Sequence, residues 1–230
     1  MTETAALLGL LQISDSLFPS GAFTHSYGLE QLAREGVVRT PVEVEAWVRS
    51  VLRLGLGPGD ATAATRAHRA ASAGDVASVI KADRSLLRTK PASELRSASL
   101  NTGRRLLEET ALHVSGAVLA EYAASVREDR TLGIHPVAFA VVAEAMGAET
   151  EETVASLLFS NVAALLQASM RLLPVSHRDV QGALHRLRPE VASLAHDASS
   201  STEAPLRSFA PLQEIASMRH AGATARLFAS

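Results

Sequence analysis

Apolar residues recur at helical spacing along most of the chain. Within residues 40–51 they lie three or four positions apart, which places them on one face of a helix. These positions are Val44, Trp47, Val48 and Val51. Thr40, Pro41 and Glu43 precede them in the order of a capping box with proline at the first helical position. The pattern therefore predicts an amphipathic helix that begins after Thr40.

Similar patterns, with cap residues, prolines or acidic residues at their starts, predict most of the other helices. The expected ranges are 61–73, 75–88, 91–109, 113–126, 135–147, 154–173 and a helix from 177 onward. The apolar stretch Val154–Leu173 has about the length of a membrane span. Polar residues such as Ser160 and Asn161 interrupt it, however, and polar groups are costly in lipid. We therefore expect a buried central helix.

Three stretches depart from the helical pattern. Gly55–Gly59 contains three glycines and a proline and is expected to be a helix-breaking turn. Ile13–Thr24 contains Pro19 and Gly21 and cannot form one regular helix. Asp197–Pro205 has the small polar composition of a mobile linker.

No stretch alternates apolar and polar residues between hairpin turns, so no sheet is expected. We predict an all-α fold: a single compact helical domain of about eight to ten helices in residues 1–196. A polar linker would follow over residues 197–205. Residues 206–230 would form an extended C-terminal tail that binds partners.

Composition narrows the range of functions. The chain is 47% hydrophobic and 20% charged, which supplies enough apolar surface for a sizeable core. Its net charge of −2 gives no general attraction to nucleic acid or to anionic membranes. The absence of cysteine excludes disulfides, thiol catalysis and thiolate metal sites. The first residues lack the basic region of a signal peptide, so we expect a cytoplasmic protein.

Aromatic residues are scarce, and more than half of them lie outside the predicted helices. These are Phe18, Phe23, Tyr27, Phe209 and Phe228. Phe18 and Phe209 suit packing of the chain ends onto the domain as well as binding. Phe23, Tyr27 and the end Arg226–Phe228 favour an exposed or shared interface, because aromatic residues are enriched at binding hot spots. The tail also carries three arginines against one glutamate, which suits an acidic partner surface.

Residue types used in nucleophilic catalysis gather near the N-terminus: Asp15, Ser16, Ser20, His25 and Ser26. A serine hydrolase of the common type places its nucleophile in a strained G-x-S-x-G turn, and this chain has none. His25 and Ser26 are expected instead to cap and orient a helix that begins near Thr24.

The eight histidines raise the possibility of a metal site. No two of them have the H-x-x-x-H spacing that presents both imidazoles on one helix face. His25 and His220 lie in the two unusual segments, where we expect a structural or interface role. The glycines of Gly55–Gly59 lack the lysine and the serine or threonine of a phosphate loop. We predict no metal ion, cofactor or catalytic residue.

Several segments occur in the same order as the motifs of one known family. The N-terminal segment Leu11–Glu30 includes the run FPSGAFTHSYGLE. The others are Glu94–Arg96, Gly103–Leu107, His135–Phe139, Arg171–Pro174, Ile215–His220 and Arg226–Phe228. Together they resemble the UreF family of urease accessory proteins along nearly the whole chain.

The resemblance implies an all-helical homodimer that joins UreD, also called UreH, and recruits the GTPase UreG. In that assembly the GTPase carries nickel, and the UreF protein couples it to the urease apoprotein without being an enzyme itself. Phe23 and Arg226 fall where the family contacts the GTPase, and the tail would become ordered against UreD. The candidate partner-binding residues are Phe23, His25, Tyr27, Arg219, His220, Arg226, Leu227 and Phe228.

The tail departs from the family pattern in places. Ala221, Gly222, Ala223 and Ala225 replace polar and aromatic residues, and Ala229 replaces a basic one.

Two other classes of function stay open: a small serine hydrolase that uses Ser26 and His25, and a direct nickel carrier that uses His25 and His220.

Overall fold

The computed structural model describes residues 2–201 and 205–229, except for the side chain of Phe23. Every regular element within these residues is a helix, which confirms the all-α prediction. In chain order they are α1 (Glu3–Ser14), η1 (Ala22–Thr24), α2 (Leu29–Arg34), α3 (Pro41–Val51), η2 (Leu52–Ala61), α4 (Thr62–Ser72), α5 (Val76–Leu87), α6 (Ser93–Thr110), α7 (Ala117–Arg127), α8 (His135–Ala145), α9 (Thr150–Leu172), α10 (His177–Ser200) and α11 (Pro211–Ala221).

Local cap chemistry sets the beginnings of several helices. At the start of α3, the Thr40 hydroxyl accepts the Glu43 N–H at 3.3 Å and the Glu43 carboxylate accepts the Thr40 N–H at 3.0 Å. Ser176 and Asp179 form the same capping box at the start of α10. Both caps satisfy amide groups that a helix leaves without partners in its first turn. The helix expected from His113 begins only at Ala117.

The core is centred on α8 and α9. Phe139 of α8 and Leu157 and Leu158 of α9 are among the largest fully buried side chains. Helix α9 packs against both α8 and α10, which matches the prediction of a central helix. By length and composition alone α9 resembles a membrane span, yet 56% of its most apolar stretch is buried inside the protein.

The expected turn at Gly55–Gly59 is absent, and that prediction was wrong. Residues 52–61 form the π-helix η2, so the chain stays helical from Pro41 to Ser72. Proline has no N–H, so Pro58 leaves one carbonyl of this helix without its usual donor. The tail lies beside the same element: the Phe209 N–H donates to the Leu54 carbonyl at 2.8 Å and the Arg207 N–H to the Pro58 carbonyl at 3.2 Å. A distant segment thus adds hydrogen bonds to η2.

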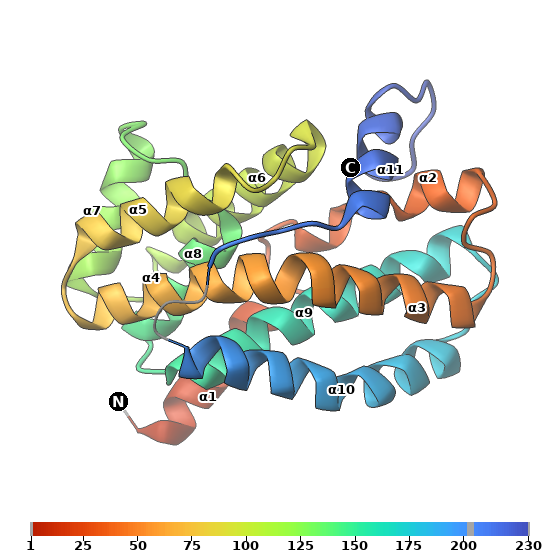
Figure 1. The fold of residues 1–230 in the computed structure, drawn as a ribbon. Coiled ribbons are helices and arrows are strands. Elements are labelled where there is room, and N and C mark those ends of the chain that lie inside the picture. The colour runs from red at the N-terminus through yellow and green to blue at the C-terminus, as the bar shows by residue number, and fades with distance from the viewer. Residues whose placement is uncertain (1, 202–204, 230) are drawn as a thin grey trace.

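The C-terminal part differs from the expected linker and extended tail. Helix α10 continues to Ser200, so the first residues of the predicted linker Asp197–Pro205 are helical, and residues 202–204 lie outside the described residues. Beyond them the chain crosses the α3–α4 run and forms α11 beside α2 (Figure 1). The tail is therefore partly helical.

Candidate functional site

The C-terminal tail folds back onto the helical body and ends beside the irregular N-terminal segment. We call residues 206–229 the docked tail. Helix α11 packs against α2 and α6. After α11 the chain returns to the N-terminal segment, where the Ala229 N–H donates to the Thr24 carbonyl at 3.0 Å. The two unusual segments of the sequence therefore form one structural unit.

A glycine permits the close approach of α11 to the N-terminal segment. Gly28 has φ +93°, a conformation that glycine adopts without the steric penalty of a side chain. A Cβ at this position would lie 3.0 Å from the Gln213 carbonyl oxygen and 3.1 Å from the Ser217 nitrogen. Any larger residue would push α11 away from α2.

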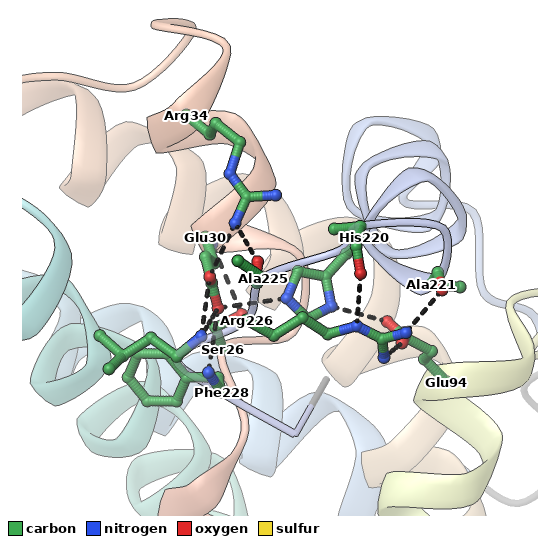
Figure 2. Close-up of polar contacts among 11 residues, drawn as sticks. Ser26, Glu30, Arg34, Glu94, His220, Ala221, Ala225, Arg226 and Phe228 are labelled. Atoms are coloured by element: carbon green, nitrogen blue, oxygen red, sulfur yellow. Dashed lines mark hydrogen bonds and ion pairs between the residues drawn. The ribbon is translucent and has the colours of Figure 1, made fainter.

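Glu30 of α2 is the centre of the contact between the body and the docked tail. Its carboxylate accepts the Leu227 N–H at 2.9 Å and the Phe228 N–H at 3.0 Å (Figure 2). Arg34, one helical turn further along α2, donates to the same carboxylate at 3.0 Å. Burial alone would raise the pKa of Glu30, but the two amide donors and His220 outweigh it and hold that pKa below its usual value.

His220 of α11 lies between two carboxylates and has no exposed surface. Its Nε2 is 3.1 Å from Glu30 Oε2, and its Nδ1 is 3.0 Å from Glu94 Oε2. Glu94 belongs to α6, so the imidazole joins three helices. Figure 2 shows the ring bridging the two acidic side chains. A neutral imidazole donates from one nitrogen only, whereas this geometry presents an acceptor to each nitrogen.

Arg226 and Phe228 complete the contact. Arg226 donates to Glu94 Oε1 at 2.8 Å and to the Ala221 carbonyl at 2.7 Å. The Phe228 side chain is 4% exposed, and the guanidinium of Arg171 lies 5.9 Å from its ring centroid. That distance suits a cation–π contact. The end of the docked tail is thus held by both charge and apolar burial.

The N-terminal polar residues are largely buried. His25 is 7% exposed, and burial, reinforced by the charge of Arg105, lowers its pKa to about 4. Its ring lies 5.6 Å from that of Tyr27. Burial and the nearby Asp60 raise the pKa of Tyr27 far above its usual value. Ser26 has no exposed surface, and its hydroxyl accepts the Glu30 N–H at 3.4 Å.

The positions of Ser26 and His220 bear on the two alternative functions, a serine hydrolase and a direct nickel carrier. The Ser26 hydroxyl is shielded from solvent, so it offers no accessible nucleophile to a substrate. Both ring nitrogens of His220 face carboxylates of the chain itself. Within residues 2–201 and 205–229, no group of three His, Cys, Asp or Glu side chains is placed to hold a metal ion.

The outer face of the docked tail is apolar. Leu212, Ile215 and Met218 are spaced at helical intervals on α11, and each is nearly half exposed. We call these three side chains the tail stripe. Two further apolar side chains of the docked tail lie outside α11 and are also exposed: Phe209 at 75% and Leu227 at 61%. Exposed apolar side chains gathered on one element are a common feature of protein-binding surfaces.

The structure brings most of the predicted partner-binding residues together, although not all on the surface. His25, Tyr27, His220 and Phe228 are buried or half-buried, whereas Arg219, Arg226 and Leu227 are on the outside. The expectation of an exposed end is therefore wrong for Phe228. Its own amide and that of Leu227 bind Glu30, and these bonds hold the ring against the body. The side chain of Phe23 lies outside what the structure describes.

The expected attraction of the tail arginines to an acidic surface is met partly within the chain. Arg219 pairs with Glu35 at 3.1 Å and Arg226 pairs with Glu94 at 2.8 Å. Sequence reasoning did not identify the acidic partners Glu30 and Glu94. The spacing of Glu30 and Arg34, four residues apart, marked only an ordinary helix ion pair.

The fold and this contact define an all-helical protein that docks its own C-terminal segment beside its N-terminal segment. Comparison with known proteins identifies its family. The UreF family model matches residues 38–188. The chain belongs to the UreF family.

Relatives in several bacteria match almost end to end. The urease accessory protein UreF of Bacillus sp. (strain TB-90) is 30% identical over 224 residues, which cover 97% of this chain and 99% of the relative. That of Paenarthrobacter aurescens (strain TC1) is 32% identical, with 97% of each chain covered. That of Trichodesmium erythraeum (strain IMS101) is 30% identical over all of this chain and 99% of its own.

Proposed function

We propose that this protein is a cytoplasmic assembly factor for urease that acts by binding other proteins and has no catalytic activity. Its partners are UreD (UreH), the GTPase UreG and the urease apoprotein, and nickel is the cargo delivered to urease. In this role it is a homodimer and an adaptor, and it modulates the GTPase. Family membership supports the urease pathway, and the docked tail supports the adaptor role.

The observation that carries the proposal is the tail stripe. The inner face of the docked tail is occupied by the body, through Glu30, His220 and Phe228. The outer face keeps Leu212, Ile215 and Met218 of α11 partly in solvent, and Arg219 of the same helix is exposed as well. Methionine and arginine are enriched in protein–protein interfaces. A surface of this kind fits a protein partner better than a small-molecule substrate.

The placement of the candidate catalytic residues supports a non-enzymatic role. Ser26 is fully buried and His25 is 7% exposed. A hydrolase would need both groups to meet a substrate. We therefore assign them a structural role beneath the binding surface.

The test is a pull-down with UreD and UreG, scored also for urease activation, with Met218→Glu as the main variant. A charge in an apolar hot spot is expected to weaken binding by about tenfold or more. Val42→Glu is the matched control, because Val42 is an exposed apolar residue on α3 rather than on the tail. Phe23→Ala tests the N-terminal half of the surface in the same assay.

Removal of residues 206–230 should abolish recruitment of at least one partner, and the partner that is lost identifies what the tail stripe binds. Normal assembly and activation by both the truncated protein and Met218→Glu would contradict the proposal. Circular dichroism establishes that each variant keeps its helical fold.

A further inference from the structure

A small polar chamber lies between the helical body and the docked tail. Its volume is about 40 Å³, which is room for about three water molecules. The body surrounds it with residues of η2, α6, α8 and α9, and the tail contributes Ser208, Gln213 and Glu214. We call this cavity the tail-side chamber. It is formed only when the tail is docked, because three of its polar walls belong to the tail.

The docked tail is bonded to the body on two sides of the chamber. On one side, the Phe209 N–H donates to the Leu54 carbonyl of η2 at 2.8 Å. On the other side, Glu214 Oε2 accepts the Ala92 N–H, just before α6, at 2.9 Å. The segment between these bonds therefore covers the chamber, and lifting it would open the chamber to solvent.

Two polar groups that line the chamber are free to bind a guest molecule. Within residues 2–201 and 205–229, the Tyr27 hydroxyl and the His135 ring nitrogens have no hydrogen-bond partner. Both residues also line a neighbouring cavity of about 20 Å³. Tyr27 has φ +52°, a strained conformation for a residue with a side chain, and such strain gathers at functional sites. Polar groups inside a protein normally have partners, so these two groups indicate a bound molecule.

The charged groups of the chamber already have partners within the chain. Lys90 Nζ lies 2.8 Å from Asp60 Oδ1 and 3.1 Å from Asp60 Oδ2. Glu214 binds the Ala92 amide. Burial, and then the charge of Lys90, lowers the pKa of His135 to about 4, so this ring is uncharged at neutral pH. An additional ion would lose its water shell without gaining an unpaired counter-charge, which is costly. The chamber therefore suits an uncharged guest.

The lining offers both donors and acceptors to such a guest. Burial and Asp60 hold the pKa of Tyr27 far above its usual value, so its hydroxyl keeps its proton and can donate. A neutral imidazole has one donor and one acceptor nitrogen, and His135 provides both. The Asn161 amide nitrogen donates to the Leu157 carbonyl at 2.7 Å, which leaves the amide oxygen of Asn161 as an acceptor.

We infer that the tail-side chamber is a binding site for a small uncharged molecule that both donates and accepts hydrogen bonds, and that the docked tail is its lid. A guest of about three non-hydrogen atoms, such as formamide, matches the volume of the chamber. The site belongs to the isolated chain and does not rest on the proposed partners. It holds or fails separately from the pull-down experiment.

Nuclear magnetic resonance of the isolated full-length protein, titrated with formamide, tests the site. The ring signals of Tyr27 and His135 should shift together and reach saturation. A Kd of about 1 mM or weaker is expected, because so small a ligand has few atoms with which to bind. Formate has nearly the same shape but carries a negative charge, and it should bind at least about tenfold more weakly.

Tyr27→Phe keeps the ring and removes the unpartnered hydroxyl, so the affinity for formamide should fall by about five- to tenfold. Tyr122→Phe is the matched control, since Tyr122 is the other tyrosine of the chain and donates to Asp83 at 3.0 Å, away from the chamber. Its loss should leave the affinity unchanged. If the wild type shows no saturable shift, water alone occupies the chamber and the site is overturned. Equal affinities for formate and formamide would overturn its preference for an uncharged guest.

The lid is tested by hydroxyl-radical labelling of the full-length chain, read by mass spectrometry. Ala216 lies on the inner face of α11, where a Cβ on Gly28 would be 3.2 Å from its own Cβ. Ala216→Glu should therefore lift the tail and raise the labelling of Tyr27 several-fold. Met218→Glu places the same charge on the outer face of α11 and should not. Tyr122, which is fully buried in the body, reports whether the body stays folded. Equal labelling of Tyr27 in the two variants would overturn the lid.

Discussion

The centre of the body and the docked tail are held by different kinds of interaction. The α8–α9 core buries apolar side chains, such as Phe139 and Leu157, from neighbouring helices. The docked tail is fastened chiefly by carboxylates that bind amides, an imidazole and an arginine. Apolar burial needs no specific partner, whereas each buried polar group needs its own hydrogen-bond partner. The same chain therefore combines a frame held by packing with a segment held by a few specific polar contacts.

The largest expected effect lies in the core. Phe139→Ala should destabilise the whole protein by about 3–5 kcal/mol, because it removes a fully buried ring and leaves a cavity. Denaturant unfolding monitored by circular dichroism measures the change. Phe209→Ala is the control, since Phe209 is mostly exposed and its loss should have little effect on the unfolding midpoint. Equal losses for the two variants would contradict the view that α8 anchors the frame.

Lowering the pH should destabilise the folded protein through His25, by somewhat less than Phe139→Ala does. Its pKa is about 4 in the folded protein and 6.5 without the fold, so the unfolded chain gains a proton first as pH falls. Above about pH 6.5 His25 is neutral in both states and does not lower the free energy of unfolding. As pH falls from 6.5 towards 4, that free energy decreases by about 2–4 kcal/mol.

Unfolding free energies measured from pH 7 to pH 4 check this prediction. His25→Gln should reduce the slope in this window, because glutamine does not titrate. His135, whose pKa burial and Lys90 lower to about 4, adds a slope of the same sign in both proteins. An unchanged slope in His25→Gln would show that His25 is not buried as a neutral group.

The smallest effect on global stability is expected at the tail. Glu30→Gln removes the charge that His220, Arg34 and the two tail amides share. The end of the tail should detach, with a large local rise in hydrogen exchange at residues 222–229. Once the end of the tail has detached, water can reach the groups that lost Glu30 as their partner. The unfolding free energy of the body should therefore change by less than about 1 kcal/mol.

Arg219→Ala is the matched control for this variant. It removes the ion pair with Glu35, in which the arginine side chain is exposed. Exposed ion pairs of this kind contribute about 0.2–1 kcal/mol to the free energy of unfolding. Exchange at residues 222–229 should then stay close to that of the wild type. A global loss of stability in Glu30→Gln, comparable to that of Phe139→Ala, would remove the distinction between frame and tail.

The sequence by itself determined the all-helical fold, many helix starts and the family. Caps such as Thr40 with Glu43 act over a few residues, and apolar spacing reports one face of one helix. Both signals are local, so they can be read directly. The aromatic residues near the two ends of the chain also lie in the two segments that meet in the fold, although the sequence did not show which of them would be buried.

Only the tertiary structure decided how those segments meet. Glu30 and His220 are 190 positions apart, and Glu94 and His220 are 126 apart, so no local pattern links them. The same holds for Leu54, whose carbonyl accepts the N–H of Phe209 at the start of Gly55–Gly59. In both cases the hydrogen-bond partner comes from a distant part of the chain, and it is in place only once the chain has folded.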